Sequence, residues 1–169
     1  ALRAEAEEMV ASIEKAAALG RVQAALDLGG PFDAVLPALG EVPAALSDHA
    51  ATGIPTLKSL QTSFPPAARA ALDAALRANM GESWTDRFTT FLRSQSGARS
   101  LEPRAGTDPD AVLSRAEAAL TAGDLATALT ELATLPQPSQ LALADWLAAA
   151  QQRQAAVDAV AALIPALQQ

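Results

Sequence analysis

The stretch TDPDAVLSRAEAALTAGDLATALTELATL, residues 107–135, predicts two amphipathic helices that fold back on each other. Thr107 or Asp108 can cap the first helix, and Pro109 suits its first turn because its φ is already helical. Gly123 suits the left-handed residue that closes a helix, and Asp124 suits the N-cap of the next one. Apolar residues recur at helical spacing, which gives each helix one apolar face. These residues are Val112, Leu113, Ala116, Ala119 and Leu120, then Leu125, Ala128, Leu129, Leu132 and Leu135. We therefore expect a helical hairpin that packs and docks but supplies no reaction chemistry.

Downstream of the hairpin, the sequence predicts one long final helix. Pro136 and Pro138 separate it from the hairpin, Ser139 can cap it, and Pro165 can end it. Its small residues permit close helix approach and hence a dimer. The candidate interface residues on this helix are Leu143, Trp146, Leu147, Ala150 and Val157. Packing inside the chain's own core is the alternative, especially for Trp146.

Upstream, residues 1–28 predict one helix, which Gly29-Gly30-Pro31 ends and which Gly20 is expected to weaken or break. It resembles the end of a longer coiled coil, and because the chain starts within it we expect a longer parent protein. Glycines and prolines divide residues 31–64 into short helices, and Pro65-Pro66 is expected to open a new helix that ends near Met80. The residues expected on the apolar side of the first helix are Leu2, Met9, Ile13, Ala17, Ala24 and Leu28.

The composition favours an all-α fold. Half of the residues are hydrophobic, but most of these are alanine and only 4% of the chain is aromatic. Alanine is the best helix former, and no β-branched residues alternate as they do in a strand. We expect a helical bundle of short helices with a C-terminal helical hairpin and one long final helix. The predicted domains are an N-terminal helical region (1–64), an amphipathic membrane-binding segment with a linker (65–106), and a helical domain (107–169).

The chain lacks the residues for several chemistries. It has no cysteine and a single histidine, His49, so the sequence predicts no metal centre and no cofactor. The net charge of −7 argues against nucleic acid as a partner. No nucleophile, metalloprotease or phosphate-loop motif occurs, so we expect no enzyme. No apolar run is long enough to span a bilayer.

The aromatic residues gather in one short segment. Trp84, Phe88, Phe91 and Leu92 recur at i, i+4, i+7 and i+8, and therefore share one helix face. Arg87 and Arg93 flank this face, and residues 65–104 carry six arginines against four acids, a net charge of +2. Such a helix can lie in a membrane interface, with its guanidinium groups on anionic lipid headgroups. The alternative is that this face points into the core of a helical bundle.

Several of these stretches resemble the mitofilin family of inner-membrane proteins, in particular its bacterial members. The resemblance rests on Asp108–Pro136 followed by LADWLAAAQQR (143–153), and on GPF (30–32) and GIPTLKSL (53–60) upstream. It implies a membrane anchor, a coiled coil, an amphipathic membrane-binding segment and a terminal mitofilin domain. Carried over by position, the membrane-binding segment is WTDRFTTFLR (84–93). The chain departs from the family in the polar SQSGARSLE (94–102), where relatives continue into a Val/Arg-rich run.

The resemblance implies a non-enzymatic scaffold that shapes membranes at crista-junction-like contact sites. The expected location is the periplasm, as a domain of a bacterial protein anchored in the inner membrane. The expected partners are an anionic lipid membrane, a second copy of the chain, and outer-membrane or periplasmic proteins. One alternative is a protein-docking helical module with no lipid contact. Another is an inactive helical relative of the tetrapyrrole-pathway membrane proteins.

Overall fold

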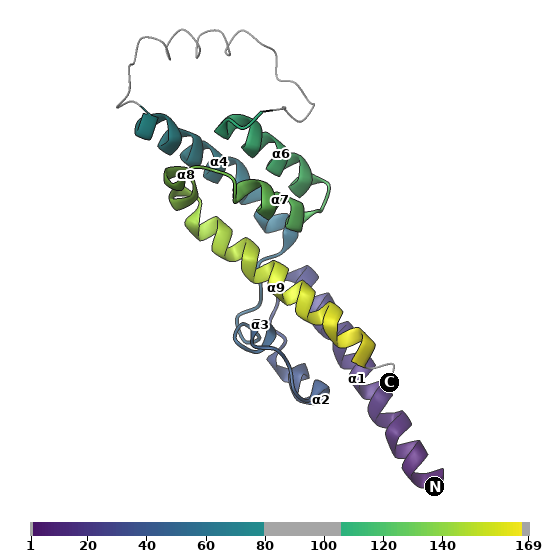
Figure 1. Cartoon of the computed structure of the whole chain (residues 1–169). Helices are drawn as coiled ribbons and strands as arrows, with labels where there is room; N and C mark the ends of the chain where they lie inside the picture. The colour runs from purple at the N-terminus through teal and green to yellow at the C-terminus, as the bar shows by residue number, and fades with distance from the viewer. Residues whose placement is uncertain (1, 80–105, 167–169) are drawn as a thin grey trace. The chain divides into compact units, whose positions relative to one another are not determined.

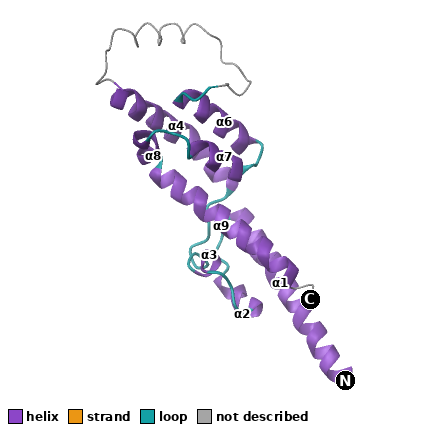
Figure 2. Cartoon of the chain, in the orientation of Figure 1, coloured by secondary structure: helices purple, strands orange, loops and turns teal. Residues whose placement is uncertain are grey.

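The computed structural model describes residues 2–79 and 106–166, which form the helices shown in Figure 1. Within these residues the fold is all-α, as the composition predicts, and Figure 2 shows helices joined by loops. The elements are α1 (Leu2–Leu28), the 3-10 turn η1 (Asp33–Val35), α2 (Leu36–Leu39), α3 (Ala44–Ser47), α4 (Leu57–Asn79), α6 (Pro109–Thr121), α7 (Leu125–Leu132), α8 (Gln137–Ala142) and α9 (Ala144–Ala166). None of the helices described is both long and apolar enough to cross a membrane.

The chain divides into two compact units. The first unit comprises Ala1–Ser59 and Ala149–Gln169, and the second comprises Leu60–Ala148. The first unit is therefore built from two pieces of chain, whereas the second is continuous. The three domains expected from the sequence stay a prediction.

In the first unit, the second half of α1 lies beside α9 (Figure 1). Their shared core also receives side chains from the connection between α1 and α4. Its buried members are Leu19, Val22, Leu26, Phe32, Leu46, Ala50, Ile54, Ala156, Ala159 and Val160.

The apolar face expected on α1 is wrong. Leu2, Met9, Ile13 and Leu28 are exposed, and the helix buries Ala18, Leu19, Val22 and Leu26 instead. Ala17 and Ala24 are exposed too, so the side that α1 buries is opposite to the expected one, and only the second half of the helix contributes to it. The break expected at Gly20 is also wrong, since α1 continues through it. A helical glycine costs about 1 kcal/mol relative to alanine, and burial of Leu19 and Val22 on either side offsets that cost.

The turn after α1 brings two backbone segments into close contact. Gly29 ends the helix as expected, with its amide donating to the Ala25 carbonyl at 2.8 Å. Gly53 has a φ of +77°, and a Cβ at this position would lie 2.5 Å from the Gly29 carbonyl oxygen and 2.9 Å from that of Gly30. Only glycine permits this approach, so the glycines of the two motifs GPF and GIP form one crossing of the backbone.

In the second unit, α4 runs without interruption through Pro65 and Pro66, so the helix start expected at these prolines is wrong. A proline inside a helix costs about 3 kcal/mol because it removes an intrahelical hydrogen bond and crowds the preceding turn. Leu60 and Phe64 are buried just before the prolines, and Ala71 just after them. Burying one large apolar side chain contributes about 1.5–3 kcal/mol, so packing on both sides maintains the helix.

The hairpin of residues 107–135 forms as predicted. The Asp108 carboxylate caps α6 by accepting the Ala111 amide at 3.0 Å. Gly123 has a φ of +87° between the two helices. The Asp124 carboxylate then caps α7, accepting the Thr127 amide at 2.9 Å and the Thr127 hydroxyl at 2.6 Å. The hydroxyl bond, followed by the amide bond, lowers the pKa of Asp124. Both helices bury the apolar faces that close the hairpin.

The final helix starts later than the sequence predicts. A short helix, α8, precedes it, and the chain turns at Leu143 before α9 begins at Ala144. Ser139 lies inside α8 and does not cap the long helix. Its buried hydroxyl donates to the Ala71 carbonyl of α4 at 2.8 Å. Ser139 therefore links α8 to α4, a contact that could not be predicted from its position after two prolines.

Candidate functional site

The predicted membrane-binding residues fall outside the part of the chain that the structure describes. They are Trp84, Arg87, Phe88, Phe91, Leu92 and Arg93. Their role therefore stays a prediction.

The interface residues predicted on the final helix separate into two groups. Leu143, Trp146 and Ala150 are buried within the chain, in agreement with the core-packing alternative. In the second unit, the Trp146 indole N–H donates to the Leu60 carbonyl at 3.1 Å, and its ring meets Phe64 edge to face at 4.9 Å. Leu147 is half-buried, and Val157 is 41% exposed. Of the five residues, Val157 is thus the one that offers most surface to a partner.

Arg153 is the charged centre of the first unit, and sequence reasoning missed it. Arg153 is only 8% exposed. Nη1 donates to the Leu26 carbonyl at 2.8 Å and to the Pro55 carbonyl at 3.2 Å, and so ties α9 to the last turn of α1 and to the loop before α4. Nη2 lies 3.7 Å from the Asp27 carboxylate, which is beyond hydrogen-bond length. The guanidinium therefore satisfies two backbone carbonyls firmly and one carboxylate loosely.

A groove of about 350 Å³ opens beside Arg153, between α1 and α9 of the first unit. Leu26 on α1 and Val157, Val160 and Ile164 on α9 supply its apolar walls, with Arg153 and Asp27 among its polar lining. Val157 and Ile164 are both partly open to solvent. We call this surface the Arg153 groove. It combines apolar walls with a cation whose second terminal nitrogen, Nη2, can donate a hydrogen bond to a further partner.

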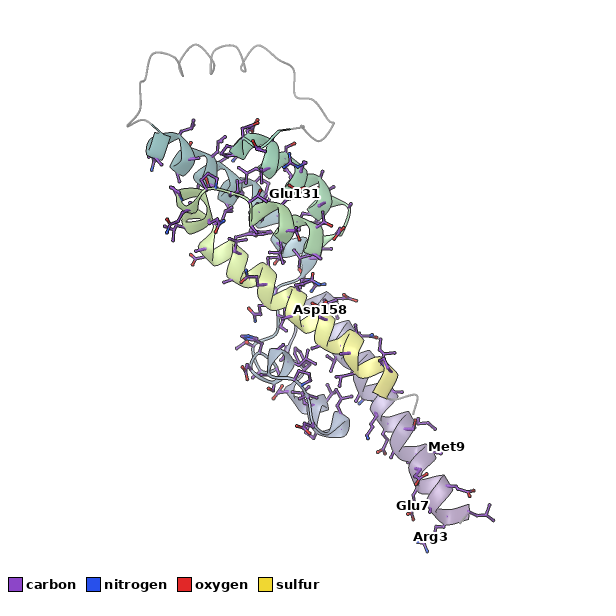
Figure 3. The ribbon with its side chains drawn as sticks, viewed as in Figure 1. Arg3, Glu7, Met9, Glu131 and Asp158 are labelled. Atoms are coloured by element: carbon purple, nitrogen blue, oxygen red, sulfur yellow. The ribbon has the colours of Figure 1, made fainter. Side chains whose placement is uncertain are left out.

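The first half of α1 is a second exposed apolar surface. Every residue from 2 to 17 is exposed. Leu2, Ala6, Met9 and Ile13 follow the spacing i, i+4, i+7 and i+11, and we call these four residues the α1 stripe. Met9 is 66% exposed and Ile13 63% exposed. Figure 3 shows the side chains of Arg3, Glu7 and Met9 standing off this end of the helix. Arg3 and Glu7 form an ion pair at 3.3 Å.

Acidic residues surround the α1 stripe. Residues 2–17 contain four glutamates, Glu5, Glu7, Glu8 and Glu14, against the two cations Arg3 and Lys15, a net charge of −2. The surface is thus both apolar and acidic.

In the second unit, Arg115 joins the two helices of the hairpin by a salt bridge and bonds to the chain before them. Arg115 on α6 donates from Nε and Nη2 to one Glu131 carboxylate oxygen on α7, at 3.0 and 2.9 Å. Its Nη1 donates to the Gly106 carbonyl at 2.8 Å, and the bond to Glu131 raises the pKa of Arg115. Gly106 is the first described residue after the segment that holds the predicted membrane-binding residues. Arg115 therefore fixes where the chain enters the hairpin.

Residues 2–79 and 106–166 bring together no group of three histidine, aspartate or glutamate side chains that could hold a metal ion. His49 lies half-buried near the end of a helical turn, where its carbonyl accepts the Gly53 amide at 2.8 Å. The backbone of His49 thus stabilises the turn that leads to Gly53.

The helices and their caps make the described part of this chain an all-α domain. The family model for mitofilin, described as a mitochondrial inner membrane protein, matches residues 37–166. The chain belongs to the mitofilin family, which confirms the resemblance seen in the sequence. The family is associated with the inner membrane and acts as a structural scaffold. Neither a curated protein nor a solved structure matches the chain significantly.

Proposed function

We propose that this chain is the scaffold domain of a membrane-shaping protein that self-associates and binds anionic membrane through residues 84–93. The observation that carries the proposal is the family match over residues 37–166, because this range includes the aromatic and arginine-rich segment as well as the hairpin. The scaffold acts without catalysis, by holding a lipid-binding segment and protein-binding surfaces in one chain.

The lipid contact is proposed from the chemistry of residues 84–93. Trp84, Phe88, Phe91 and Leu92 would enter the interface between lipid headgroups and acyl chains, while Arg87 and Arg93 would pair with anionic headgroups. The segment from Arg87 to Arg104 carries four arginines against one acid, a net charge of +3 in a chain of net charge −7. This local excess of positive charge supports a preference for anionic lipid.

The proposed location is the periplasmic side of a bacterial inner membrane, with outer-membrane or periplasmic proteins as further partners. A second candidate function, protein docking without lipid contact, is favoured by the Arg153 groove, whose apolar walls are partly exposed. The two functions differ in whether residues 84–93 touch lipid, so one binding experiment separates them.

The test is co-sedimentation with vesicles of phosphatidylcholine alone or mixed with phosphatidylglycerol. We expect the wild-type chain to sediment with the anionic vesicles and the Arg87→Asp/Phe88→Asp variant to stay in the supernatant. The matched control, Arg69→Asp/Leu141→Asp, makes the same charge reversal and also replaces a large apolar side chain by a carboxylate, at exposed positions of α4 and α8. It should sediment like the wild type. Equal sedimentation of a folded Arg87→Asp/Phe88→Asp variant would refute the lipid contact and leave protein docking as the function.

A further inference from the structure

The Arg153 groove has the length and the walls of a site for one helix. Along α9, it is lined at i, i+4, i+7 and i+11 by Arg153, Val157, Val160 and Ile164. This row covers eleven residue steps, or about 16 Å at a rise of about 1.5 Å per residue. Val157 is 41% exposed and Ile164 is 39% exposed. The groove therefore keeps apolar surface that the apolar side of another helix can cover.

The charge that this groove presents to solvent is negative. Arg153 is almost fully buried, and its Nη1 already donates to two backbone carbonyls. The Asp27 side chain, by contrast, is 79% exposed, and its carboxylate lies 3.7 Å from Nη2 of Arg153. An incoming cation therefore meets Asp27 first and stays farther from the guanidinium. Because the Coulomb energy falls with distance, the attraction to the carboxylate exceeds the repulsion by Arg153.

The rest of the first unit has the same sign of charge. Residues 1–59 and 149–169 contain five lysines and arginines against nine acids, a net charge of −4. This charge repels anionic lipid headgroups and attracts basic partners from a distance. It also opposes a second copy of the chain at this groove, since each copy has a net charge of −7. A basic protein segment thus suits the groove better than either lipid or a second copy.

We propose that the Arg153 groove binds a basic amphipathic helix of another protein. The apolar side of that helix lies on Val157, Val160 and Ile164, and one of its lysines or arginines pairs with Asp27. The inference rests on protein docking, the second function proposed for the chain, and it names the chemistry of the partner. It does not depend on the lipid contact of residues 84–93.

The test measures, by fluorescence anisotropy, the binding of labelled synthetic helices to the full chain. The lysine peptide carries leucines at i, i+4, i+7 and i+11 with lysines on both sides of this row, and the glutamate peptide has glutamate at every lysine position. We expect the wild-type chain to bind the lysine peptide at least about tenfold more tightly than the glutamate peptide. Equal binding of the two peptides, or no binding of the lysine peptide, overturns the proposed partner.

A charge reversal locates the contact at Asp27. Asp27→Lys should weaken binding of the lysine peptide about tenfold and strengthen binding of the glutamate peptide. The matched control, Asp48→Lys, makes the same change at an exposed position of the same unit, outside the groove lining. At a salt concentration of about 0.15 M it should change either dissociation constant less than about twofold, because distant charges are screened. Equal effects of the two variants would show attraction by net charge alone and would overturn the groove as the site.

The apolar walls are tested with Val157→Asn/Ile164→Asn, which should bind the lysine peptide about tenfold more weakly. The control, Leu76→Asn/Leu141→Asn, replaces two exposed apolar side chains of the second unit and should bind like the wild type. Circular dichroism checks that each variant is folded. If a reversal at Asp27 prevents folding, Asp27→Asn replaces it and should weaken binding about threefold. Wild-type binding by the folded groove variants overturns the inference but leaves the lipid contact standing, since the vesicle experiment tests that contact separately.

Discussion

Arg153 is expected to stabilise the first unit as a cap for backbone carbonyls rather than as a salt bridge. The test is Arg153→Met, which keeps most of the apolar stem and removes the guanidinium. It leaves the Leu26 and Pro55 carbonyls without their donor. A hydrogen bond to a charged group contributes about 1.5–3 kcal/mol, and water entering from the adjacent groove recovers part of the loss. We expect the free energy of opening the first unit to fall by about 2–4 kcal/mol.

The matched variant is Asp27→Asn, which removes the carboxylate that lies 3.7 Å from the guanidinium. Because the two charges are 3.7 Å apart and the Asp27 side chain is 79% exposed, its loss should cost less than about 1 kcal/mol. Raising the salt concentration to about 1 M screens exposed ion pairs and should leave the Arg153→Met effect nearly unchanged.

Hydrogen exchange measured on residues 18–28 reports this opening directly. Tryptophan fluorescence is less direct, since Trp146 belongs to the second unit. The reasoning is refuted if Asp27→Asn accelerates exchange as much as Arg153→Met does, or if high salt abolishes the difference.

Three further predictions follow from the glycine crossing, the hairpin cap and the second core. Gly53→Ala should destabilise the first unit by about 2–4 kcal/mol in urea unfolding. The new Cβ would be strained at a positive φ and would overlap two backbone carbonyl oxygens, which cannot move freely in a packed turn. A loss below about 1 kcal/mol would contradict the close backbone contact at Gly53. Asp124 has a lowered pKa in the folded chain, so its stabilising effect is complete above its unfolded pKa of about 3.9 and is lost as the pH falls through the folded value. Thermal melts at decreasing pH should therefore show a smaller acid-induced drop for Asp124→Asn, which retains a cap but cannot titrate, and equal drops would contradict this. Trp146→Phe should cost about 1–2 kcal/mol in urea unfolding, since it removes the indole bond to the Leu60 carbonyl, and an unchanged midpoint would show that this bond is dispensable.

The hairpin could be predicted from the sequence because its determinants are local. Asp108, Gly123 and Asp124 each act on residues within a few positions of themselves, through a cap or a left-handed turn. Helical periodicity then supplies the two apolar faces. The same local logic located the end of α1 at Gly29.

Contacts over long sequence distances could not be predicted in this way. Arg153 bonds to carbonyls 127 and 98 residues away, and backbone acceptors have no signature in the sequence. The prolines of α4 are strong local signals for a helix start, yet burial of Leu60 and Phe64 overrides them. On α1, Met9 and Ile13 are as apolar as Leu19 and Val22, and the positions of α9 and of residues 32–54 decide which pair is buried. Residues 84–93 lie outside the described residues, so the proposal that they bind lipid rests on their sequence and on the family match.

The two-piece construction of the first unit sets an order of events during synthesis. Leu60–Ala148 leaves the ribosome as one continuous stretch, so the second core can close as soon as it has emerged. Leu19, Val22 and Leu26 emerge earlier but must wait for Ala156, Ala159 and Val160 to complete their core. Until then the nascent chain exposes these side chains beside the α1 stripe. The residues of α9 therefore decide whether those in the second half of α1 are protected, and a truncation before Ala149 leaves an aggregation-prone helix however well the second unit has folded.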